Sequence, residues 1–113
     1  MKIINKFAFL LPFIFMMACN NRYEKEFFIE NLSIPRVDTV IFKIAPNQNV
    51  FKRIISVEGS SNGKLVIDRY ELLSGKIDTV FSSDWYASDY ILRYTPVDAT
   101  EGCLIVRLEL LAL

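Results

Sequence analysis

The segment Ser82–Tyr90 holds the residues whose types and spacing best suit molecular recognition. It contains the only tryptophan, Trp85, next to Tyr86, and it places Asp84 and Asp89 on either side of them. Each aromatic side chain offers a large apolar face and a polar tip, which suits stacking on a sugar or anchoring a protein contact. We therefore predict a binding site at Asp84, Trp85, Tyr86 and Asp89, on a loop between two strands. The alternative is that Trp85 closes one end of the core.

The aspartates of this segment are also candidate metal ligands. Asp84 and Asp89, together with Asp78 or Asp98, can offer carboxylate oxygens to a calcium ion, which takes six to eight oxygen ligands. The chain has no compact Asp-x-Asp-x-Asp loop of the kind that binds calcium. Turn-capping aspartates are therefore the favoured interpretation, and we expect neither a metal nor a cofactor.

The composition argues against an enzyme. The chain has no histidine, which removes the commonest general base and the usual zinc ligand. Cys103 has no histidine to activate it, so we expect a half-buried, inert thiol at the start of the last strand. A glycosidase needs two carboxylates across a cleft, and 13 acidic residues make some such pair inevitable by chance. The 13 basic residues balance them, so no footprint for nucleic acid is expected.

The N-terminal region has the pattern of a secretion signal. Two lysines within residues 1–6 are followed by the uncharged, almost wholly apolar run Phe7–Ala18. As a helix, these twelve residues would reach only about 18 Å, whereas the hydrocarbon core of a bilayer is about 30 Å thick. The pattern therefore favours a signal peptide over a transmembrane helix.

The end of this run, Met16-Met17-Ala18-Cys19, resembles the lipobox of bacterial lipoproteins. The resemblance covers the leader alone. It implies that residues 1–18 are a removed signal peptide and that Cys19 is lipidated as the first residue of the mature protein. Its acyl chains would hold the protein on a membrane of the cell envelope. The alternative is an ordinary secretory leader, with Cys19 free to pair with Cys103.

Residues after Cys19 refine this prediction. Asn20 follows the cysteine where an aspartate would favour retention in the inner membrane, so the outer membrane is favoured. The stretch Asn20–Glu26 is polar and charged, and we interpret residues 19–26 as a lipid-anchored tether. Lipidation of Cys19 would also leave Cys103 without a disulfide partner.

The remainder, residues 27–113, is predicted to be an all-β domain. Segments rich in Phe, Ile, Val, Tyr and Thr alternate with Gly, Pro, Asn, Asp and Ser clusters, which is typical of antiparallel sheets. We expect a small antiparallel β-sandwich of six or seven strands, immunoglobulin-like or jelly-roll, with a small barrel as the alternative. The expected strands are 38–45, 50–58, 65–73, 76–82, 90–95 and 103–111, with a weaker strand prediction within 23–32.

Two local patterns are specific enough to test. Asn62-Gly63 is a strong turn signal, since both residues tolerate positive φ, and it predicts a hairpin between strands 50–58 and 65–73. In the last strand, period-two alternation predicts that Arg107 and Glu109 face water. It also predicts four core residues, which are Leu104, Val106, Leu108 and Leu110.

Three functions are compatible with these features. The leading hypothesis is a small lipid-anchored envelope protein with a binding or structural role toward a protein or glycan. The second is a periplasmic inhibitor or immunity-type protein that blocks a lytic enzyme or toxin. The third is a small envelope hydrolase, which the absence of a catalytic motif disfavours.

Overall fold

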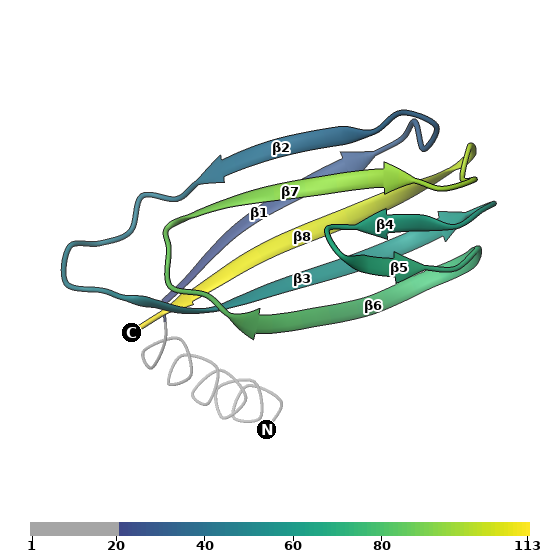
Figure 1. Cartoon of the computed structure of the whole chain (residues 1–113). Helices are drawn as coiled ribbons and strands as arrows, with labels where there is room; N and C mark the ends of the chain where they lie inside the picture. The colour runs from purple at the N-terminus through teal and green to yellow at the C-terminus, as the bar shows by residue number, and fades with distance from the viewer. Residues whose placement is uncertain (1–20) are drawn as a thin grey trace, which may run out of the picture.

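The computed structural model describes residues 21–113, which form eight β-strands and no helix (Figure 1). Within this range, accordingly, no helix is long and apolar enough to cross a bilayer. The predicted signal peptide (1–18) and Cys19 lie outside the described residues. The strands are β1 (Asn21–Ile29), β2 (Arg36–Ile41), β3 (Val50–Ser61), β4 (Leu65–Ile67), β5 (Tyr70–Leu72), β6 (Gly75–Asp84), β7 (Asp89–Pro96) and β8 (Gly102–Ala112).

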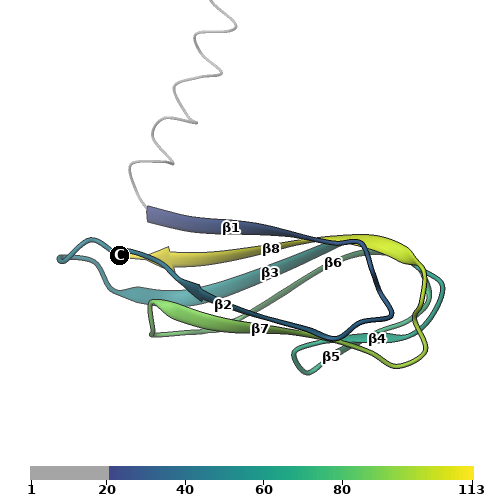
Figure 2. The same cartoon turned by 90° about the horizontal axis from the view of Figure 1, so that it is seen from above.

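The strands form two antiparallel sheets that lie face to face (Figure 2). The first sheet has the order β1-β8-β3-β6 and the second has the order β2-β7-β4-β5. The pairs are nested along the chain, because β1 pairs with β8, β2 with β7, β3 with β6 and β4 with β5. This is a jelly-roll sandwich. The predicted fold class is confirmed, with eight strands in place of six or seven.

The core lies between the sheets, and β8 contributes much of it. Leu104, Val106, Leu108 and Leu110 are each at most 1% exposed, as their alternation predicts. Arg107 points to the opposite face and forms ion pairs with two glutamates of β1. Glu109 shares that outer face, yet it is buried, because Arg22 covers it with an ion pair of 3.1 Å. The prediction that Glu109 faces water is therefore wrong.

Residues 21–26, predicted to belong to a tether, are part of β1. Their backbone pairs with β8 from Asn21 opposite Ala112 onward, without a break in register. The charged side chains of this segment suit a solvent-facing edge strand, since Glu24 and Glu26 lie 3.0 and 2.9 Å from guanidinium nitrogens of Arg107. The described β-domain therefore begins at Asn21, six residues before the predicted start at residue 27.

The predicted hairpin at Asn62-Gly63 is also wrong. The chain there crosses from the first sheet to the second, so β3 and β4 are not paired. Neither residue has positive φ. The Asn62 side chain instead accepts hydrogen bonds from the backbone N–H groups of Thr100 and Glu101, at 2.9 and 3.0 Å. Asn62 therefore ties the loop before β8 to the end of β3.

The expected strand 65–73 is two short strands joined by a tight turn. Asp68 has a φ of 56°, in the left-handed region that aspartate tolerates better than most residues. Its side chain accepts a hydrogen bond of 2.9 Å from the N–H of Arg93, and its own N–H donates to the Arg93 carbonyl at 2.8 Å. The turn thus docks onto β7, and the hairpin β4–β5 covers only part of the second sheet.

Candidate functional site

A hollow of about 390 Å³ lies where the second sheet is incomplete. β7 pairs with β4 only through Tyr94, Thr95 and Pro96, so its first residues have a strand partner on the β2 side alone. The inner face of the first sheet is therefore accessible beside the short hairpin. The hollow is lined by Arg53, Asp68, Arg69, Trp85, Asp89, Tyr90, Ile91 and Arg93.

Arg53 is the central residue of this hollow. It projects from β3 into the space between the sheets and is only 5% exposed. One terminal nitrogen, Nη1, donates a hydrogen bond of 2.6 Å to the Tyr90 hydroxyl, and Nη2 donates one of 3.0 Å to the Tyr70 hydroxyl. The third nitrogen, Nε, is buried and has no partner. Buried polar groups are nearly always satisfied, so an unpartnered N–H at this place is unusual.

Tyr90 connects Arg53 to a carboxylate. Its hydroxyl accepts from Arg53 and donates to Oδ2 of Asp68. Burial, and then the hydrogen bond to Asp68, hold the pKa of Tyr90 well above its usual range. Tyr90 therefore stays protonated and neutral, and Asp68 balances the Arg53 charge only through this hydroxyl.

Aromatic rings hold the arginine in place. The Arg53 guanidinium carbon lies 5.1 Å from the ring centroid of Tyr90 and 5.9 Å from that of Tyr70. Tyr70 is stacked on Phe81, with centroids 4.0 Å apart. Such cation–π and stacking contacts fix the orientation of the charge without neutralising it.

The lining of the hollow contains three arginines and two aspartates. Arg69 and Arg93 are exposed at its rim, and Arg53 forms its inner wall. Within residues 21–113, none of these three guanidinium groups is within ion-pair distance of a carboxylate, whereas the other three arginines all are. Unpaired arginines that share a site favour an anionic ligand, because guanidinium matches carboxylate and phosphate geometry.

The structure places only two of the four predicted site residues at the hollow. Trp85 is half-buried, packs against the core, and lies edge-on to Tyr90 with centroids 5.0 Å apart. Its Nε1 donates to the carbonyl of Asp89 at 3.0 Å, and both residues line the hollow. Tyr86 is 77% exposed and Asp84 ends β6, and neither contributes to the lining.

Sequence reasoning did not find Arg53, Asp68 or Tyr70. These residues lie on separate strands and become neighbours only when the sheets pack. One usable signal was present, since Arg53 occupies an inward position of a strand whose other inward residues, Ile55 and Val57, are apolar. A charged residue at a core position is unusual enough to mark a site.

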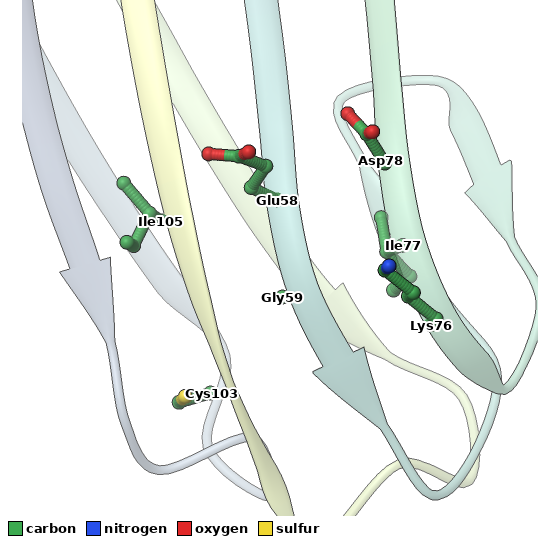
Figure 3. Close-up of a pocket in the computed structure, with 7 residues that line it drawn as sticks. All are labelled: Glu58, Gly59, Lys76, Ile77, Asp78, Cys103 and Ile105. Atoms are coloured by element: carbon green, nitrogen blue, oxygen red, sulfur yellow. The ribbon is translucent and has the colours of Figure 1, made fainter.

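A second hollow of about 350 Å³ lies on the outer face of the first sheet (Figure 3). Glu58 on β3 and Asp78 on β6 are paired in the strand register, and the Glu58 carboxylate points toward β8, away from Asp78. No group of three or more metal-ligating side chains occurs within residues 21–113. Cys103 lines this hollow and is exposed, so the predicted half-burial of its thiol is wrong. Cys103 lies on the outer face of β8, which no other strand of residues 21–113 covers.

Comparisons with known proteins add a fold likeness alone. No family model matches the chain, and no curated protein matches its sequence. The coat protein of tobacco streak virus is 10% identical, covers 82% of this chain and 84% of its own, and has a TM-score of 0.46. A de novo designed double-stranded β-helix is 11% identical, covers 78% of this chain and 97% of its own, and has a TM-score of 0.37.

Proposed function

We propose that this protein is a lipid-anchored protein of the cell envelope, and that its jelly roll binds an acidic saccharide in the hollow around Arg53. The observation that carries the binding proposal is the convergence of three unpaired arginines, one of them buried with a free Nε, on one hollow. A sugar carboxylate would satisfy these groups. The half-buried Trp85 lines the hollow and offers an apolar surface for the sugar ring.

The lining favours binding over turnover. It contains no serine, threonine, cysteine or lysine. Its one hydroxyl belongs to Tyr90, whose raised pKa makes it a poor nucleophile. One of its two carboxylates, Asp68, already accepts from Tyr90 and from the Arg93 N–H. These contacts support a role in recognition.

Titration with glucuronate and with glucose tests the ligand class. We expect glucuronate to perturb Trp85 fluorescence and to give a binding signal in calorimetry, and glucose to do neither. A comparison of glucuronate with glucose 6-phosphate shows whether the hollow prefers a carboxylate or a phosphate. Arg93→Gln, at the exposed rim, should weaken binding by about tenfold or more, as expected for a lost charged hydrogen bond. Arg107→Gln is the matched control, because Arg107 lies on the outer face of the other sheet. Equal binding of glucuronate and glucose would contradict the proposal.

The proposed anchoring depends on the leader and the lipobox resemblance at Cys19. Intact-mass analysis of membrane-extracted protein should show a chain that begins at Cys19 with added acyl mass. Cys19→Ala should lose both the acyl mass and the membrane association. Unmodified protein in the soluble fraction would refute anchoring and leave the binding proposal standing.

A further inference from the structure

We propose that one end of the jelly roll rests directly on the phospholipid surface that holds the anchor. This surface, the near end, consists of Asn21 at the start of β1, the loop 42–49 and the loop 85–88. The inference rests on the proposed lipidation of Cys19. In this arrangement the domain is not held away from the membrane by a tether. One end of it lies against the lipid headgroups.

The near end is a single continuous surface. Asn21 and Val50 both lie opposite Ala112, on either side of β8. The N–H of Phe42 donates to the Ser88 carbonyl at 2.9 Å, which joins the two loops. Figure 1 shows both loops and the start of β1 at the same end of the sandwich. The loops 30–35, 62–64, 73–74 and 97–101 form the opposite, far end.

Chain length brings this end to the membrane. Only Asn20 separates Cys19 from the first residue of β1. Consecutive Cα atoms are about 3.8 Å apart, so the Cα atoms of Cys19 and Asn21 are separated by at most about 7 Å. An acylated cysteine sits at the lipid surface. The first paired residue of the sheet must then lie within one headgroup layer of that surface.

Exposed apolar side chains at the near end suit this contact. Tyr86 is 77% exposed and Ile41, next to the loop 42–49, is 76% exposed. They are the two most exposed large hydrophobic residues in the described part of the chain. Tyrosine is enriched at membrane–water interfaces, where its ring lies at headgroup level.

The charges of the loops also favour contact between the near end and lipid. The loops 42–49 and 85–88 contain no acidic residue, and Lys43 is their only charged residue. The far-end loops carry three acidic residues, Glu30, Asp98 and Glu101, and one basic residue, Lys64. Lipid phosphates repel carboxylates and attract lysine, so the near end is the one that lipid headgroups accommodate.

Fluorescence quenching by spin-labelled lipids tests the orientation. The acylated full-length chain is reconstituted into phosphatidylethanolamine–phosphatidylglycerol vesicles that contain headgroup spin-labelled phospholipid. One sample carries a fluorophore on the native Cys103, at the far end of β8. The other carries it at the near end, in the double variant Ser88→Cys, Cys103→Ser. Nine residue steps along β8 lead from Cys103 to Ala112 at the near end, which is a distance of about 30 Å. We expect loss of fluorescence at position 88 and none at Cys103, since nitroxide quenching is short-ranged.

Charge variants sharpen the same experiment. Ile41→Glu combined with Tyr86→Glu should reduce quenching at position 88. The matched far-end pair, Ile34→Glu with Leu73→Glu, should leave it unchanged, although both side chains are more than half exposed. Equal quenching at the two label positions in acylated protein would overturn the orientation and leave anchoring intact. A chain without acyl mass that stays off the vesicles would overturn both proposals.

Discussion

Arg53 Nη1 and the hydroxyl of Tyr90 are joined by a hydrogen bond of 2.6 Å that links the two sheets through the core. Arg53 belongs to β3 of the first sheet and Tyr90 to β7 of the second. The bond therefore stabilises the packing of the sandwich and also orients a charged group in the hollow. Substitutions of Arg53 and of Tyr90 should therefore differ in their effects on stability and on ligand binding.

Tyr90→Phe should destabilise the fold. It removes the acceptor for a buried guanidinium and the donor to Asp68, while the Arg53 charge stays buried. We expect a loss of about 1.5 to 3 kcal/mol in the free energy of unfolding, as for hydrogen bonds to charged groups. Urea denaturation measures it. Tyr86→Phe is the control, because Tyr86 is exposed. Similar effects of the two variants would contradict the assigned role of Tyr90.

Arg53→Met should cost less stability than Tyr90→Phe and should abolish glucuronate binding. It removes a buried guanidinium that has no carboxylate within ion-pair distance in residues 21–113, and Tyr90 keeps its hydrogen bond to Asp68. The burial cost avoided with the charge offsets the two hydrogen bonds lost to Tyr90 and Tyr70, so we expect an unfolding free energy within about 1 kcal/mol of the wild-type value. Thermal denaturation and calorimetric titration on the same sample separate the two effects. A binding-competent Arg53→Met variant would show that the hollow recognises its ligand without the buried arginine.

Tyr90 should also produce a stability loss at high pH. Its folded-state pKa is raised above the usual value of 10.0, so its contribution is fully present below that value. Above it, the unfolded chain releases this proton while the folded chain retains it. Stability should then fall by about 1.4 kcal/mol per pH unit from this group. Urea unfolding one pH unit below and above 10.0 should show a steeper loss in wild type than in Tyr90→Phe. Tyr94, whose pKa burial also raises, contributes equally to both.

Asn62→Gly distinguishes a loop tie from a hairpin turn. In a positive-φ hairpin turn, glycine would be tolerated or favoured. In the jelly roll, the substitution removes the acceptor for the N–H groups of Thr100 and Glu101 and the donor to the Thr100 hydroxyl. We expect a loss of about 1 to 3 kcal/mol in the free energy of unfolding. An unchanged or higher stability would favour the hairpin interpretation.

Backbone amides of residues 21–26 should be protected from hydrogen exchange. They lie in β1 and pair with β8, so exchange requires local separation of the edge strand. Exchange measured by NMR should show slow amides in this segment that alternate with fast ones, as expected for an edge strand bonded on one side. Uniformly fast exchange would contradict the pairing of residues 21–26 with β8 and would favour the tether that their composition suggests.

Much of the fold could be predicted because strand patterning is local. Period-two alternation identified the inward residues of β8, and turn-forming residues separated most strands. The errors arose in segments whose residue types fit two different structures. Charged residues 21–26 suit both a tether and an edge strand, and Asn62-Gly63 suits both a hairpin and a crossing between sheets. The candidate site was half predicted, since Trp85 and Asp89 line the hollow and Asp84 and Tyr86 do not.

The sequence by itself determined the all-β class and the inward faces of the strands, because side-chain alternation is a property of neighbouring residues. Only the tertiary structure decided which strands pair and what surrounds the hollow. Asp68 meets Tyr90, and Tyr90 meets Arg53, across separations of 22 and 37 residues. Contacts of that range follow from how two twisted sheets close over one core, and no local pattern encodes them.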